Sequence, residues 1–141
     1  MKGLVGFWTA LAVTLTIQGT ASAELMSEER RVALCKEAAE RYETLDVEKP
    51  KGDAVAVVLM YKYNFCPREL TVKKGTTIHF INVDKRTSHS VWFREAGKEE
   101  SVRMFPEEGW TTPMLAEGEF PYLCGPHGEQ EQMTGKVTVT P

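Results

Sequence analysis

The sequence predicts an all-β fold, a β-sandwich or barrel, that is preceded by one α-helix. Apolar residues first recur every three or four positions, between residues 25 and 45, as on one face of a helix. After a polar stretch rich in Lys, Pro and Gly, residues 48–53, apolar and polar residues alternate in short runs separated by turn-forming residues. With 141 residues, 42% of them hydrophobic, and a formal charge of −3, the chain has room for one modest core.

Residues 1–23 are typical of a secretory signal peptide. They carry one charge, Lys2, followed by the apolar run Leu4–Ile17 and by small residues at Ala21–Ala23, where a signal peptidase cleaves. The apolar run is shorter than the ~20 residues of a membrane span. We therefore expect cleavage after Ala23, no membrane span in the mature chain, and export to an oxidising compartment, the periplasm.

Residues 24–48 are expected to form an N-terminal helical segment, with the helix itself over Leu25–Leu45. Ser27 is the predicted N-cap, and Glu28 and Glu29 lie in the first turn, where the helix dipole favours acidic side chains. The predicted apolar face of this helix consists of Val32, Cys35, Ala39 and Tyr42.

Residues 49–141 are expected to form the β-domain. Alternation places Ile78 and Phe80 on an inward face and His79 on the outward face, so we expect no role for His79. The segment Arg94–Gly109 is charged and unpatterned, which predicts a surface loop. The seven predicted strands are Val55–Tyr63, Leu70–Val72, Thr76–Val83, His89–Phe93, Thr111–Leu115, Glu119–Cys124 and Lys136–Thr140.

The three cysteines suit two different roles. Cys124 opens a turn that ends at His127, so a thiolate and an imidazole meet there and form half of a transition-metal site. Cys35 lies on the predicted helix face and Cys66 at the end of a strand. In an exported protein we expect these two to form a disulfide that pins the helix to the sheet.

Two further residues complete the donor set of a copper site. His89 begins a predicted strand, and Met133 stands just before the last one. A thiolate, two imidazoles and a weak, distant thioether are the donor set of a blue-copper site. Such a site suits the transfer of single electrons.

The chain from about Val55 to Val139 resembles the cupredoxins, most closely small bacterial plastocyanin-like and amicyanin-like proteins. The resemblance implies a Greek-key β-sandwich, the cupredoxin fold, with one type 1 copper ion. It also implies that Asn82 and Ser90 support the ligands through hydrogen bonds. The segments that carry the resemblance are Phe65–Pro67, Leu70–Val72, Gly75, Phe80–Asp84 with His89–Val91, Tyr122–His127 and Met133–Val137, and the ligands it implies are His89, Cys124, His127 and Met133.

The closing loop departs from this pattern. Five residues, 128–132, separate His127 from Met133, one more than is usual in plastocyanin-like loops. We expect Met133 to be the axial ligand, with an oxygen of Gln130, Glu131 or Gln132 as the alternative.

We therefore expect an exported, monomeric copper protein that carries single electrons between redox partners such as c-type cytochromes. Glu129 and Glu131, beside His127, would suit a partner that presents lysines. The alternatives are an open copper site that binds or reacts with a small molecule, and copper storage or delivery. The chain has no basic stripe, which argues against nucleic acid as a partner, and no recognisable catalytic set, which argues against an enzyme.

Overall fold

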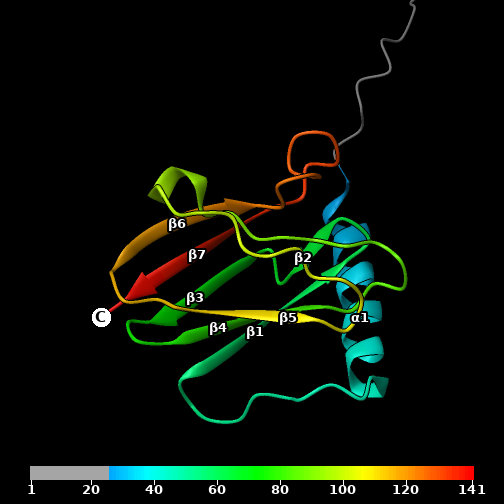
Figure 1. Cartoon of the computed structure of the whole chain (residues 1–141), viewed down its shortest axis with the longest axis horizontal. Helices are drawn as coiled ribbons and strands as arrows, with labels where there is room; N and C mark the ends of the chain where they lie inside the picture. The colour runs from blue at the N-terminus through cyan, green and yellow to red at the C-terminus, as the bar shows by residue number, and fades with distance from the viewer. Residues whose placement is uncertain (1–25) are drawn as a thin grey trace, which may run out of the picture.

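The computed structural model describes residues 26–141, which form a sandwich of two β-sheets with one helix on its outside (Figure 1). The predicted signal peptide lies outside the described residues. The elements are α1 (Glu28–Thr44), β1 (Val55–Tyr61), β2 (Asn64–Cys66), β3 (Glu69–Lys73), β4 (Thr77–Asn82), the short 3₁₀ helix η1 (Arg94–Ala96), β5 (Gly109–Pro113), β6 (Gly118–Leu123) and β7 (Thr134–Thr140).

The two sheets are mixed. The first has the order β2-β1-β4-β5 and the second the order β3-β7-β6. β1 pairs with β4 and β3 pairs with β7 in parallel, whereas the remaining neighbours are antiparallel. Because the chain changes sheet between β2 and β3, between β3 and β4, and again between β5 and β6, segments far apart in sequence meet at the same end of the sandwich. The predicted sandwich with one preceding helix is confirmed.

Helix α1 begins where its capping residues predict. The Ser27 hydroxyl oxygen accepts a hydrogen bond from the backbone N–H of Arg30, and Glu28 and Glu29 occupy the first turn. The hydrogen bond satisfies a backbone N–H group that has no partner within the helix. The two carboxylates interact favourably with the positive end of the helix dipole.

The predicted apolar face of α1 is partly wrong. Val32 is 61% exposed, and Ala39 is also exposed. The face on the sheet is formed by Leu34, Cys35, Ala38 and Tyr42 instead. Ala38 has the smallest side chain of the four and is fully buried beneath the helix.

The helix covers part of the outer face of the first sheet, over β1 and β2, so this part of the sheet is buried on both sides. Leu59, Tyr61 and Ile81 pack beneath α1, whereas Val58 and Phe80, on alternate positions, point into the sandwich. This explains why β1 and β4 end in continuous buried runs. Between the sheets, Phe65, Phe80, Phe93 and Tyr122 pack mainly edge to face.

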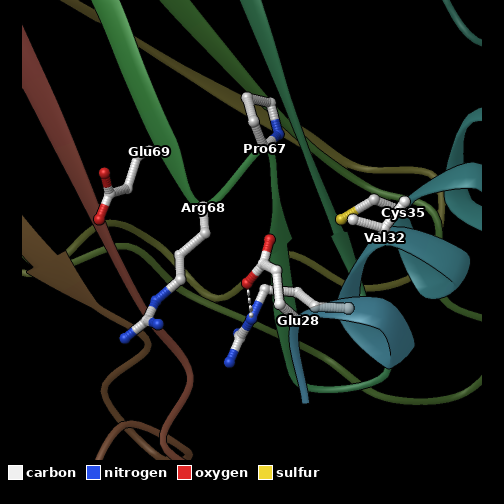
Figure 2. A pocket seen from close by; sticks show the side chains of 7 residues that line it. Glu28, Val32, Cys35, Pro67, Arg68 and Glu69 are labelled. Carbon is white, nitrogen blue, oxygen red and sulfur yellow. Dashed lines mark ion pairs between the residues drawn. The ribbon is translucent and has the colours of Figure 1, made fainter. Parts of the chain in front are cut away.

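A disulfide joins the helix to the sheet. Cys35 of α1 and Cys66 of β2 are bonded, with their Cα atoms 5.2 Å apart. Beside it lies a cavity of about 490 Å³ between the start of α1 and the turn after β2 (Figure 2). The disulfide and the hydrogen bond from Arg31 to Asn64 join this part of the helix to β2. The lining residues are Glu28, Arg31, Val32, Cys35, Pro67, Arg68 and Glu69.

Two strand predictions need correction. His89–Phe93 is not a strand, because it has only the isolated bridges of His89 to Met104 and of Trp92 to Leu123. Its alternating side chains are nonetheless buried as predicted, since His89, Val91 and Phe93 all point into the core. The predicted strand Val55–Tyr63 ends at Tyr61, and β2 follows it after a two-residue turn.

The expected surface loop Arg94–Gly109 is more structured than predicted. It contains η1, and Met104 is almost fully buried. Met104 is drawn inward because its backbone exchanges two hydrogen bonds with that of His89. In the part of the chain that the structure describes, no helix has the length and apolar character needed to cross a membrane.

Candidate metal centre

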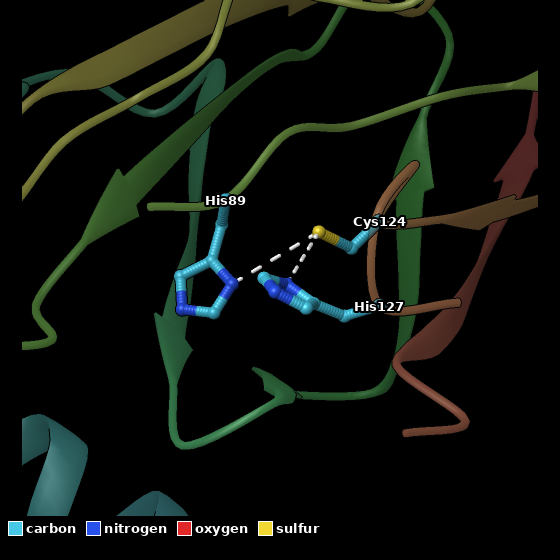
Figure 3. Close-up of side chains that lie close together, drawn as sticks. All are labelled: His89, Cys124 and His127. Carbon is cyan, nitrogen blue, oxygen red and sulfur yellow. Dashed lines mark hydrogen bonds between the residues drawn. The ribbon is translucent and has the colours of Figure 1, made fainter. Parts of the chain in front are cut away.

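Three predicted ligands converge at one end of the sandwich. The ligand atoms of His89, Cys124 and His127 all lie within 4.8 Å of one another (Figure 3). Cys124 Sγ is 3.9 Å from Nδ1 of His89 and 3.4 Å from Nδ1 of His127. His89 comes from the segment after β4, whereas Cys124 directly follows β6 and His127 lies in the next turn.

A tight turn brings the His127 imidazole back toward the sulfur. The carbonyl oxygen of Cys124 accepts hydrogen bonds from the N–H groups of His127, at 3.2 Å, and of Gly128, at 2.7 Å. A Cβ atom on residue 128 would lie 2.6 Å from Cδ1 of Leu123 and 2.8 Å from the Cys124 carbonyl oxygen. Glycine is therefore required for this close approach.

The surroundings of Cys124 favour its thiolate form. The side chain is fully buried, and among the described residues it is the free cysteine. Burial disfavours the charged sulfur, but hydrogen bonds from His89 and from the backbone N–H of Ser90, at 3.4 Å, hold the pKa of Cys124 below its usual value. A thiolate is the form that binds a transition metal.

Ser90 links the two ligand-bearing segments. Its hydroxyl oxygen accepts a hydrogen bond from the N–H of Gly125 at 3.0 Å and donates one to Oε1 of Glu100 at 2.5 Å. Because Ser90 follows His89 and Gly125 follows Cys124, these bonds fix the distance between the two ligand residues. The resemblance implies a supporting role for Ser90 at the metal centre, and that role stays a prediction.

Asn82 closes the loop that carries His89. Its side-chain NH₂ donates to the carbonyl oxygens of Thr87, at 2.8 Å, and Met104, at 2.9 Å, and its side-chain oxygen accepts from the N–H of Asp84. All of these partners lie in the loop before His89 or in the segment paired with it. Asn82 therefore supports the backbone of the loop and not a ligand side chain.

Asp84 is a site residue that the sequence analysis missed. Its Oδ2 lies 3.1 Å from Nε2 of His89, the ring nitrogen that faces away from the sulfur. Burial disfavours a charged His89, but the hydrogen bonds with Asp84 and Cys124 raise its pKa overall. Burial likewise opposes a charged Asp84, whose pKa is lowered by the His89 bond and by backbone N–H groups. A carboxylate behind a ligand histidine fixes the ring orientation and the donor tautomer.

Replacing Asp84 with alanine is expected to weaken copper binding about 10- to 100-fold, the usual cost of removing such a partner. Asp84→Asn, which retains an oxygen acceptor without the charge, should lose less. Competition with a chelator of known affinity measures both losses. Asp53→Asn, at an exposed position before β1, is the control. Equal affinity of Asp84→Ala and the wild-type protein would show that the carboxylate does not hold the ring.

Met133, the predicted axial ligand, lies beside the closing loop in the core. Its side chain is fully buried in the same cluster as Cys124. Its carbonyl oxygen accepts from the N–H of Cys124 at 3.0 Å, and its own N–H donates to the His127 carbonyl oxygen at 3.3 Å. Gln132, at a φ of 55°, turns the lengthened loop back inward. Gln130, Glu131 and Gln132 are all exposed, which favours Met133 over their oxygens.

The charge beside His127 differs from the acidic face expected there. Glu129 forms an ion pair with Arg94 at 3.4 Å, so its charge is partly neutralised. Partial burial, together with the positive charges of His89 and Arg103, lowers the pKa of His127. The neutral imidazole is therefore favoured, which is the form that binds a metal.

His79 takes no part in this site, because it lies on the outward side of β4 and is half-buried there.

The fold and this donor set define a class of protein. A two-sheet sandwich that brings a buried cysteine, two histidines and a methionine to one end is typical of proteins with a type 1 copper site. The chain belongs to the cupredoxins, since the model of the Cupredoxin-like domain family matches residues 8–139.

Particular relatives are plastocyanin and amicyanin. The chain is 31% identical over 85 residues to the chloroplastic plastocyanin of Chlamydomonas reinhardtii, a match that covers 53% of this chain and 57% of that protein. The match thus spans little more than half the length of this relative. An oxidised proline-to-glycine variant of amicyanin is 28% identical with a TM-score of 0.57 over 67% of this chain and 90% of its own. A methionine-to-alanine variant, described as a Cu(I) form, is 30% identical with a TM-score of 0.56 over 64% and 86%.

The donors also fit copper on chemical grounds. The set contains one soft thiolate and two imidazoles that both present Nδ1, with a thioether nearby. Soft sulfur with imidazole selects copper over the hard cations, which prefer oxygen. The cluster of His89, Cys124, His127 and Met133 is accordingly typical of a type 1 copper site.

Proposed function

We propose that the protein is an exported carrier of single electrons between larger redox proteins. In this proposal His89, Cys124 and His127 are the strong ligands and Met133 is the axial ligand. Copper bound there would supply one-electron chemistry by alternating between Cu(II) and Cu(I). The observation that carries the proposal is the convergence of three soft or borderline donors within 4.8 Å in a buried site.

The chain's contribution is to hold the donors in fixed positions. Asp84 orients the ring of His89, Ser90 ties the two ligand segments together, and the Cys124 carbonyl oxygen holds the His127 turn. None of these bonds involves the metal. The donors would therefore keep one arrangement in both oxidation states, which keeps the structural cost of electron transfer low.

A partner would reach the site along the partly exposed side of His127. The half-buried Pro126 and Gly125 lie beside it, and the nearby charges, Glu131 and Arg103, have opposite signs. A c-type cytochrome remains the partner we propose. Export to the periplasm is supported by the signal-like segment 1–23 and by the disulfide, which persists in oxidising compartments.

The test of this function is the visible absorption and electron paramagnetic resonance spectrum of residues 24–141 with one equivalent of Cu(II). We expect an intense thiolate-to-copper band and a narrow copper hyperfine splitting. Reversible one-electron voltammetry should accompany them. Weak colour with a wide splitting would contradict the carrier and favour an open copper site. Irreversible voltammetry with readily exchanged metal would favour copper storage or delivery.

A further inference from the structure

The turn between β1 and β2 has an uncommon backbone. Tyr61 pairs with Asn64, which leaves only Lys62 and Tyr63 to reverse the chain. Both have positive φ, 46° and 60°. Turns of this kind favour Asn and Gly, and a bulky side chain at positive φ is strained. Such strain persists only where the surrounding structure enforces it, and it is concentrated at functional sites.

The turn points Tyr63 at the metal centre. The centroid of its ring lies 4.9 Å from that of His127, at an interplanar angle of 67°, and 6.2 Å from that of His89. Tyr63 is 38% exposed, and its ring contacts the candidate ligand His127. Tyr63 thus stands between the two imidazoles and the outside of the molecule.

The same carboxylate oxygen holds the turn and a ligand. Oδ2 of Asp84 accepts a hydrogen bond from the backbone N–H of Lys62 at 2.9 Å, and it also lies 3.1 Å from Nε2 of His89. The side-chain NH₂ of Asn64 donates to the carbonyl oxygen of Lys62 at 2.8 Å. The strained turn is therefore fixed directly to the segment that carries His89.

Helix α1 braces the hairpin from the other side. Arg31 donates to Oδ1 of Asn64 at 3.2 Å. Glu37 accepts a hydrogen bond from the Tyr61 hydroxyl at 2.5 Å and forms an ion pair with Lys62 at 2.9 Å. The Cys35–Cys66 disulfide joins the same helix to β2. The helix thus contacts the residues on both sides of Tyr63.

We infer that Tyr63 is a positioning residue that holds the His127 ring in place and closes the metal centre to small molecules. The inference rests on the proposed metal centre. Packing of the Tyr63 ring against the half-buried His127 limits rotation of that imidazole and covers one approach to the Cys124 sulfur. Helix α1 contributes by keeping the strained turn in place, which gives this helix a role at a site to which it supplies no ligand.

Two matched variants separate the ring from the turn. Tyr63→Asn removes the ring but suits the left-handed backbone, and Tyr63→Phe keeps the ring without the hydroxyl. Tyr63→Gly is a second ringless variant that tolerates positive φ. Thermal melts of all three identify the folded proteins.

The first measurement needs no metal. Cys124 is the one cysteine outside the disulfide, so its reaction with an aromatic disulfide reagent reports access to the site. Loss of one aromatic contact predicts about two- to tenfold faster reaction in Tyr63→Asn, and Tyr63→Phe should match the wild-type protein. Unchanged rates in both ringless variants would overturn the inference.

The second measurement uses the copper form. Azide should alter the charge-transfer band of Tyr63→Asn at concentrations that leave the wild-type and Tyr63→Phe spectra unchanged. If the wild-type protein shows no such band, the proposed metal centre is wrong. The thiol measurement then still tests whether Tyr63 limits access to Cys124. If the band is present and azide acts equally on all proteins, the role of Tyr63 fails and the metal centre stands.

A double-variant cycle tests whether helix α1 keeps Tyr63 in place. Glu37→Gln weakens the contacts to Tyr61 and Lys62, and it should reproduce part of the faster thiol reaction. Combined with Tyr63→Asn it should add nothing further, because both changes act on the same ring. Glu40→Gln, on the exposed side of α1, is the control. Additive effects of the two changes would show that α1 does not act through Tyr63.

Discussion

Replacing Cys124 with serine is expected to abolish the intense visible absorption and to weaken copper binding more than any other single change in the chain. The absorption needs a sulfur-to-copper charge transfer, and serine has no sulfur. Its hydroxyl is also a far poorer donor than a thiolate whose pKa is already lowered by His89 and Ser90. Titration with Cu(II), followed by absorption and chelator competition, measures both losses.

Two histidine variants provide the matched comparison. His127→Gln removes an imidazole from the cluster and should shift the spectrum toward that of an open copper site. His79→Gln removes an imidazole from the outward side of β4 and should leave the spectrum unchanged. Retention of the band in Cys124→Ser, or its loss in His79→Gln, would place the copper elsewhere. The serine variant should remain folded because the buried side chain is nearly the same size.

The cysteine and histidine of the closing loop could be predicted because they lie within one turn. Cys124 and His127 are three residues apart, so local backbone geometry alone brings their side chains together. His89 could be predicted because its place relative to the motifs resembles the family pattern. The structure adds the distances, and it shows that His89 and His127 both present Nδ1 to the sulfur.

Asp84 and Tyr63 could not be predicted, because their roles depend on tertiary contacts. Nothing in the run of residues before His89 indicates that Oδ2 of Asp84 reaches its ring. Tyr63 continues the alternating pattern of the first strand, and the Lys62-Tyr63 turn contains neither Asn nor Gly to indicate a reversal. The nearest sequence signal was the Asn that follows the turn.

The segment His89–Phe93 shows what an alternating pattern can predict. Alternation indicates which side chains are buried, and His89, Val91 and Phe93 are buried as expected. It does not indicate hydrogen-bonding partners. The segment pairs with two different parts of the chain, each at a single position. His89 pairs with Met104, and Trp92 pairs with Leu123. The helix face was wrong for a related reason, since the periodicity of α1 fits more than one face and contact with the sheet selects between them.

Replacing both Cys35 and Cys66 with serine is expected to lower the free energy of unfolding by roughly 3 to 4 kcal/mol, the chain-entropy value for a loop of this length. The bond closes a loop with a sequence separation of 31 and joins α1 to β2. Urea unfolding of residues 24–141, followed by circular dichroism, measures the change. The double variant avoids the stray thiol that either single variant would create.

The copper spectrum of this double variant separates anchoring from ligation. The ligands come from the sandwich, so the thiolate-to-copper band should persist in the folded variant, with easier access for azide if α1 keeps the Tyr63 turn in place. Chemical reduction of the wild-type disulfide is the independent control and should reproduce the same loss of stability. A loss much below 1 kcal/mol would show that the contacts of Glu37, Arg31 and Ala38 hold the helix without the bond. Loss of the band itself in a folded protein would show that α1 forms part of the scaffold of the metal centre.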